Sequence, residues 1–127
     1  MPQRIQRDMM LKEQLRDALA IYEPGRAEGS PGATAAAVLL LLYSRDDGVH
    51  LLFQKRSQQV EHHKGEVSFP GGARDTDDTG LADTALREAH EEVGVEPQHV
   101  DLLGEIDEIW TVSNYRVRPF VGWLDRW

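Results

Sequence analysis

Three glutamates and a glycine pair are the residues of this sequence whose types and spacing best suit chemistry. Glu88, Glu91 and Glu92 stand at i, i+3 and i+4, downstream of glycines 71 and 72. On a helix, this spacing brings the three carboxylates within a few ångströms of one another. Such crowding is unfavourable unless a cation sits among them. One neighbouring arginine, Arg87, cannot neutralise the group, so the pattern points to a bound metal ion.

Hard divalent cations supply the missing charge. Magnesium and manganese prefer carboxylate oxygens, and magnesium often completes its shell with waters and substrate phosphates. Cleavage of a phosphoanhydride needs these parts, namely a cation that neutralises developing charge and an activated water. The glycine pair predicts a tight turn whose carbonyls and amides can approach metal or phosphate closely. Three exposed glutamates are usually just a solvated helix face, and the glycine pair, the Arg87-Glu88 pair and the terminal Gly94-Val95 together favour the metal site.

The whole chain limits the partners of such a site. With 127 residues, a net charge of −8 and a pI near 5.0, the sequence argues against a nucleic-acid partner, which needs a basic surface. The chain has no cysteine, which excludes disulfides and thiolate metal sites and fits a cytoplasmic location. The longest apolar run, residues 35–43, is far shorter than the about 20 residues of a membrane-spanning helix. We therefore expect no membrane partner.

The elements that must position the glutamates follow from hydrophobic periodicity and turn signals. The pattern predicts one domain over residues 1–127, with an N-terminal helix and loop in 1–30 and a sheet with a second helix in 31–127. The helix carrying the glutamates is expected over 80–93, with Asp78 or Thr79 as N-cap and Gly94 just past its end. The other expected elements are a helix over 8–22 and strands over 35–43, 49–56, 100–110 and 116–124, with a short segment at 66–69 before the Pro-Gly-Gly break. This order indicates a mixed α/β domain with a largely antiparallel or mixed sheet.

The second helix has two distinct faces. With 100° per residue, an apolar stripe falls in an arc of about 100°, and the glutamates occupy an adjoining arc of similar width. The apolar stripe comprises Ala82, Ala85, Leu86, Ala89 and Val93. We expect this stripe to pack on the sheet and the glutamates to line the site. Arg87 is expected to pair with Asp83 or Glu91, one turn away on either side.

The glycine pair and the segment "REAHEEVGV" together resemble the Nudix box, G-x5-E-x7-R-E-U-x-E-E-x-G-U, where U is apolar. Residues 87–95 fit the second half at every position, whereas the first half has one residue too many between Gly72 and Arg87. No glutamate occupies its early acidic position, for which Asp77 or Asp78 would substitute. An extra residue here is familiar in the coenzyme A pyrophosphatase branch of the family. The resemblance implies an α/β fold, a Nudix-like α/β/α sandwich with a mixed sheet.

A second motif of that branch, L-L-T-x-R-[SA]-x3-R-x3-G-x3-F-P-G-G, is similar to residues 52–72. Eight positions match with the correct spacing: Leu52, Arg56, Ser57, Gly65, Phe69, Pro70, Gly71 and Gly72. Phe53 replaces the second leucine, and two positions differ outright, since the threonine is Gln54 and the second arginine is Glu61. A carboxylate at position 61 would repel a phosphate that a guanidinium would bind. Lys64 with His62 and His63 would have to compensate.

The resemblance implies a metal-dependent hydrolase of nucleotide-type small molecules. It assigns a magnesium or manganese ion to Glu88, Glu91, Glu92 and the Gly71 carbonyl, with Arg87, Glu88 and Glu91 as catalytic residues. Substrate-binding residues would be Arg56, Ser57, Lys64, Gly65 and Gly72. The leading substrate is coenzyme A or an acyl derivative, cleaved at its pyrophosphate to 3′,5′-ADP and 4′-phosphopantetheine.

Two alternatives to this function stay open. One is a pyrophosphohydrolase for ADP-ribose or nucleoside triphosphates, and the other is a Nudix-like module that binds a nucleotide or partner without turnover. Relatives in the family usually continue into a further strand and a second helix, so we expect the sheet to be incomplete at its C-terminal end. A hypothesis that follows is that an exposed face including residues 119–127 forms a homodimer.

Overall fold

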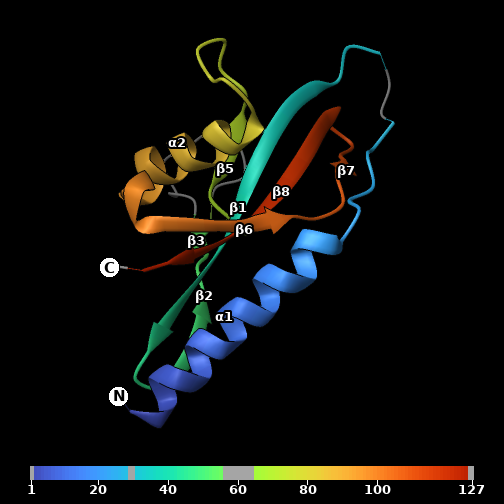
Figure 1. Ribbon diagram of the computed structural model, residues 1–127. Helices are drawn as coiled ribbons and strands as arrows, with labels where there is room; N and C mark the ends of the chain where they lie inside the picture. The colour runs from blue at the N-terminus through green and yellow to red at the C-terminus, as the bar shows by residue number, and fades with distance from the viewer. Residues whose placement is uncertain (1, 29–30, 56–64, 126–127) are drawn as a thin grey trace.

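The computed structural model describes residues 2–28, 31–55 and 65–125. Helix α1 (Gln3–Ile21) and helix α2 (Leu81–Val93) lie on opposite sides of a mixed sheet, as Figure 1 shows. The strands are β1 (Thr34–Arg45), β2 (Gly48–Leu51), β3 (Gln54–Lys55), β4 (Val67–Ser68), β5 (Gly71–Ala73), β6 (Val100–Glu105), β7 (Ile109–Trp110) and β8 (Tyr115–Leu124). A short 3-10 helix, η1 (Pro97–His99), precedes β6. The α/β/α sandwich with a mixed sheet is therefore confirmed.

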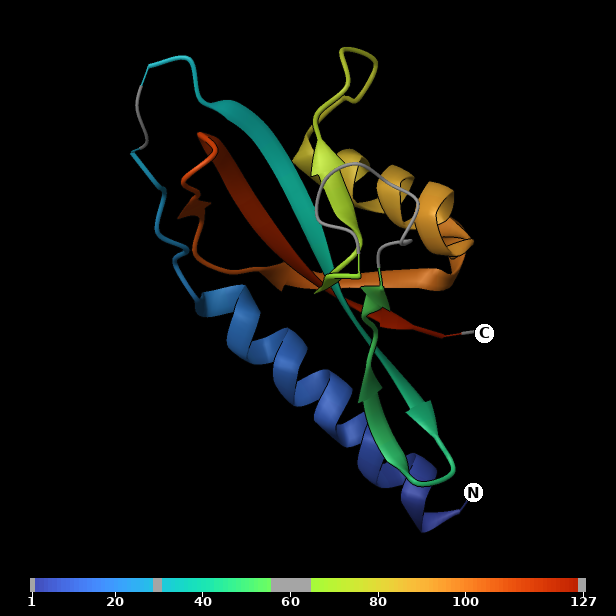
Figure 2. The same cartoon turned by 180° about the vertical axis from the view of Figure 1, so that it is seen from behind.

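Strand β1 is the centre of the sheet. Its register with β8 is parallel, and its partners on the other edge, β2 and β5, are both antiparallel. The order β2-β1-β8-β6 is completed by β5 beside β1 and β7 beside β8, while β3 and β4 form a separate two-stranded sheet. Figure 2 shows the short β5 lying between β1 and α2. The sheet therefore places β5, which contains Gly71 and Gly72 and is called the glycine strand below, directly beside the helix that carries the glutamates.

Each face of the sheet has its own core. On the α2 side, Leu39 and Leu41 of β1 pack with Ala85 and Ala89, all four fully buried, which confirms the apolar stripe predicted for this helix. On the α1 side, Leu15 and Leu19 pack against a cluster of Leu103, Val121 and Trp123. Burial of these apolar side chains is the main stabilising force for the three layers.

Several expected boundaries were wrong. Helix α1 begins at Gln3 rather than residue 8. The strand expected over 49–56 is divided into β2, which pairs with β1, and β3, which pairs with β4 in a separate sheet. The strand expected over 100–110 is likewise divided into β6 and β7.

The face expected to lie exposed near the C-terminal end is covered. Phe120, Val121, Trp123 and Leu124 are each at most 8% exposed, because α2 and α1 cover the two faces of β8. The exposed surface on which the dimer hypothesis was based is therefore absent from residues 119–124. Among the described residues, no helix is both long and apolar enough to cross a bilayer.

Candidate functional site

The glycine pair lies in strand β5, not in the tight turn expected from the sequence. Gly71 and Gly72 pair with Val38 and Ala37 of β1. A methyl group on Gly71 would lie 2.7 Å from Val38 Cγ1, and one on Gly72 would lie 2.7 Å from the carboxyl carbon of Glu88. Both distances are too short for a real side chain. The two glycines are therefore needed for close approach, one toward β1 and the other toward α2.

Helix α2 ends where the sequence predicts but begins differently. Gly94 adopts a left-handed conformation (φ 74°) and its amide donates to the His90 carbonyl at 3.0 Å, which confirms it as the C-terminal cap. Gly80 occupies the N-cap position, and within the described residues no side chain caps this end. The expected caps are used otherwise, since the Thr79 hydroxyl donates to Asp83, and Asp78 binds Arg87.

Arg87 is fixed by a carboxylate outside its own helix. Its Nε and Nη2 donate to the two carboxyl oxygens of Asp78 at 3.0 and 3.1 Å, a fork that matches the geometry of a carboxylate. Nη2 also donates to the Ala73 carbonyl of β5 at 3.2 Å. The remaining nitrogen, Nη1, faces Glu88 (3.1 Å) and Glu91 (3.3 Å). Of the two partners expected for Arg87, Glu91 is therefore the one it contacts, and Asp83 is not.

Asp78 is the acid that takes the early position of the motif. Its side chain is 6% exposed, and the buried Thr84 hydroxyl (2.8 Å) and the Asp75 amide (2.9 Å) both donate to its Oδ2. The Arg87 guanidinium, together with these hydrogen bonds, holds the pKa of Asp78 well below its ordinary value. Asp78 is therefore ionised at neutral pH. Asp77, the other candidate, is exposed.

The three glutamates differ in environment. The Glu88 side chain is 19% exposed, whereas that of Glu91 is 56% exposed. Burial raises the pKa of Glu88, Arg87 opposes this shift, and the neighbouring Glu92 carboxylate raises the pKa further. Glu92 Oε1 accepts a hydrogen bond from the Gly71 amide at 3.0 Å, and its Oε2 accepts one from the Gln54 amide group. Two carboxylates thus meet at the glycine strand with the same charge.

This donor set fits a hard divalent cation. All the ligands are oxygens, and Glu88 and Glu92 both reach the glycine pair, Glu88 against Gly72 and Glu92 at the Gly71 amide. Over the described ranges, however, no three acidic or histidine side chains are already arranged around a single point that could hold an ion. Both Glu88 and Glu91 instead contact Arg87 Nη1.

The predicted substrate-binding residues are only partly described. Arg56, Ser57 and Lys64 lie outside the described residues, whereas Gly65 precedes β4 in a left-handed conformation (φ 76°). Gly72 lines a cleft of about 360 Å³ between β5, β1 and the β7–β8 hairpin. Other lining residues of this cleft are Glu66, Ser68, Phe69, Gly71, Thr111, Ser113 and Tyr115. A larger cleft of about 630 Å³ lies between α1 and the far end of β1, at Lys12, Tyr43 and Trp123. We assign the smaller cleft to the site, because the glycine pair forms its wall.

Sequence reasoning missed two residues of this arrangement. Gln54 appeared only as a departure from the upstream motif, and its contact with Glu92 joins residues 38 positions apart. Thr84 carried no signal other than a polar residue inside the helix, at a position that turns out to be fully buried. Helical geometry places Thr84 in the arc of the glutamates rather than in the apolar stripe, so its burial comes from the loop that carries Asp78 and no sequence signal indicates it.

The sheet, the helix and the glycine strand match those of a known family. The family model described as NUDIX domain matches residues 33–126, and the chain therefore belongs to the NUDIX domain family. A relative from Enterobacter sp. (strain 638), called uncharacterized Nudix hydrolase NudL, is 44% identical over 87 residues. That match covers 68% of this chain and 45% of the relative, so this chain spans less than half the length of its relative.

Solved structures share the fold at lower identity. A Nudix hydrolase from M. smegmatis, RenU, is 24% identical with a TM-score of 0.60, covering 80% of this chain and 71% of the other. The NUDIX domain of Shewanella oneidensis NrtR, crystallised with ADP ribose, is 21% identical with a TM-score of 0.61 and covers 87% of this chain and 71% of its own. Nudix hydrolases generally use divalent metal ions, which agrees with the oxygen-rich donor set at Gly71.

Proposed function

We propose that this chain hydrolyses the pyrophosphate bond of a nucleoside-diphosphate derivative, with coenzyme A or an acyl-coenzyme A as the leading substrate. The observation that carries the proposal is the meeting of Glu88 and Glu92 at the glycine strand, where Glu92 binds the Gly71 amide and Glu88 fills the space above Gly72. Like charges are brought together there at a strand that exposes backbone groups. A divalent cation and a phosphate are the ligands that such a place accepts.

We infer the roles of the residues from the family motif together with their contacts. Glu88, Glu91 and Glu92, with the Gly71 carbonyl, would hold magnesium or manganese, which supplies charge neutralisation for the phosphates when bound. Arg87, locked by Asp78, orients Glu88 and Glu91. One of these two glutamates takes a proton from the attacking water as its oxygen bonds to phosphorus. The phosphorus–oxygen bond of the anhydride then breaks, giving 3′,5′-ADP and 4′-phosphopantetheine from coenzyme A.

The choice of coenzyme A comes from the upstream motif. Eight of its positions match in residues 52–72, including Arg56, Ser57 and Gly65. The cleft beside Gly72 has hydroxyl-bearing walls, and Glu66 is its one charged lining residue among those described. Such walls suit an uncharged part of the substrate rather than its phosphates. We infer that Arg56, Ser57 and Lys64, together with Gly65 and Gly72, contact the substrate.

The test is product analysis with a panel of substrates. The chain is incubated with coenzyme A, ADP-ribose or a nucleoside triphosphate, each with magnesium or manganese and with a chelator control. Metal-dependent 4′-phosphopantetheine from coenzyme A is the expected result. Faster cleavage of ADP-ribose or the triphosphate would overturn the substrate, and binding without any cleavage would favour a module that only binds. A cytoplasmic location, the absence of nucleic-acid and membrane partners, and a homodimer stay predictions, the last of which sedimentation checks.

A further inference from the structure

We propose that Gln54 is a positioning residue that holds Glu92 in place for cation binding, an inference that rests on the proposed function. The side-chain amide of Gln54 donates to Glu92 Oε2. The other oxygen, Oε1, accepts the Gly71 amide at 3.0 Å. Each oxygen of one exposed carboxylate is therefore fixed by a different segment of the chain. A glutamate side chain at the end of a helix otherwise samples several rotamers.

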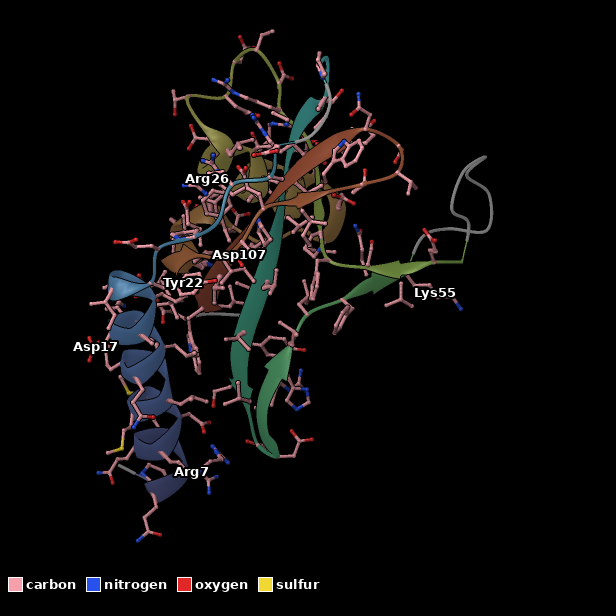
Figure 3. All side chains as sticks on the ribbon, turned by 90° about the vertical axis from the view of Figure 1, so that its right-hand side faces the viewer. Arg7, Asp17, Tyr22, Arg26, Lys55 and Asp107 are labelled. Atoms are coloured by element: carbon pink, nitrogen blue, oxygen red, sulfur yellow. The ribbon has the colours of Figure 1, made fainter. Side chains whose placement is uncertain are left out.

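The fold provides a specific support for this contact. Gln54 lies in β3, where it pairs with Ser68 of β4, the strand that leads into the glycine strand. Gln54 therefore belongs to a two-stranded sheet that is separate from the central sheet, and from there it contacts Glu92 in the C-terminal half of α2. The neighbouring Lys55 lies on the opposite side of β3, because successive side chains of a strand alternate, and it points away from the protein (Figure 3). One face of this short strand is therefore directed at the site.

The contact also explains why a glutamine at position 54, where the motif has threonine, would be useful. The upstream motif has threonine where this chain has Gln54. Glutamine is longer than threonine and ends in an NH₂ group with two donors, so it reaches a carboxylate on another element without losing its place in the strand. Groups that orient the ligands of a metal typically change its affinity by about 10–100-fold when removed. We therefore expect residue 54 to set the affinity of the site for its cation.

The experiment measures manganese affinity rather than turnover. Mn²⁺ is titrated into the metal-free chain and the free ion is followed by electron paramagnetic resonance, for wild type, Gln54→Met, Lys55→Met and Glu92→Gln. Gln54→Met keeps the length of the side chain and removes the donor, so its dissociation constant for Mn²⁺ is expected to rise about tenfold or more. Lys55→Met, the matched control on the same strand, is expected to stay within about twofold of wild type, and thermal unfolding shows whether each variant is folded.

The double variant separates positioning from a general structural effect. If Gln54 acts through Glu92, then Gln54→Met adds nothing to the loss already caused by Glu92→Gln. Additive losses, or an unchanged affinity in a folded Gln54→Met, would overturn the role of Gln54 and leave the proposed function standing. A wild-type chain with no affinity for Mn²⁺ would overturn both. A Gln54→Met chain that fails to fold would assign this side chain to the fold and overturn its positioning role.

Discussion

Replacing the two adjacent glycines by alanine, one at a time, is expected to damage two different properties of the protein. At Gly71 the new methyl group would lie 2.7 Å from Val38 Cγ1, 2.8 Å from Val38 Cα and closer still to the Ala37 carbonyl oxygen. Carbon atoms ordinarily pack at about 3.5–4.0 Å, and these neighbours belong to the central strand β1. Because β1 cannot move without disturbing its partners, the clash must be absorbed as strain.

At Gly72 the obstacle is the end of a side chain. The methyl group would lie 2.7 Å from the carboxyl carbon and from Oε1 of Glu88, and 3.0 Å from its Oε2. Rotation of the Glu88 side chain relieves this clash, so the fold is little affected. The carboxylate, however, is pushed away from the glycine strand. Displacements of about 1 Å at a reacting centre cost about 10²-fold in rate, and we expect weaker Mn²⁺ binding together with a loss of turnover of that order.

The expected losses in the free energy of unfolding differ between Gly71→Ala and Gly72→Ala. Overpacking costs about 1–3 kcal/mol, and alanine recovers about 0.5–1 kcal/mol relative to glycine in a strand. The difference spans about 0–2.5 kcal/mol, and because the clash at Gly71 is with backbone atoms we expect Gly71→Ala to fall in its upper half, whereas Gly72→Ala should lower the free energy of unfolding by less than about 1 kcal/mol. Chemical unfolding and Mn²⁺ titration on both variants measure the two effects. Gly25→Ala is the control, since its added methyl group would come no closer than 3.5 Å to its nearest neighbour, the Asp107 side chain. A Gly72→Ala chain that keeps full Mn²⁺ affinity would refute the reasoning.

Three further predictions concern single side chains. Thr84→Val should lower the free energy of unfolding by about 1–3 kcal/mol, since it removes a buried hydrogen bond to the Asp78 carboxylate, which keeps only the Asp75 amide and Arg87 as donors; thermal unfolding against Thr84→Ser, which keeps the hydroxyl, checks this. Glu92→Gln should abolish turnover and leave thermal unfolding intact; retained activity would remove Glu92 from the site. Burial alone would raise the pKa of Glu108, but hydrogen bonds from Arg118 and a backbone amide outweigh it and place the pKa below its ordinary value of 4.5. Its ionised form thus stabilises the fold above pH 4.5, and this contribution is lost as the pH falls through the folded pKa. Glu108→Gln should accordingly narrow the stability difference between pH 7 and pH 3 in chemical unfolding, and an unchanged difference would contradict it.

The parts of the fold that the sequence predicts are those decided by local pattern. The apolar run at 35–43 lies within β1, and the helix from 80 to 93 and its end at Gly94 are set by periodicity and by a glycine that tolerates positive φ. Strand β5 was missed because Pro-Gly-Gly reads locally as a turn, whereas pairing with β1 draws the glycines into the sheet. Here the pairing of β5 with β1 overrides the local preference of Pro-Gly-Gly for a turn.

The candidate site follows the same division. The spacing of Glu88, Glu91 and Glu92 on one helix could be predicted, because it depends on helical geometry alone. The choice of Asp78 over Asp77 could not, since it depends on which carboxylate the loop buries beside Arg87. The contact between Gln54 and Glu92 could not be predicted either, because β3 and α2 are brought together only by the folded chain.

The guanidinium of Arg87 stands among more carboxylates than it can balance. Its Nε and Nη2 donate to Asp78, and its Nη1 is shared by Glu88 and Glu91. Glu92 adds a further carboxylate near Glu88. An approaching polyphosphate would meet a repulsive field at this point until a cation had bound. Ligand binding should therefore be ordered, with the divalent ion entering first, and the concentration of free metal then governs how fast an anionic substrate can be captured.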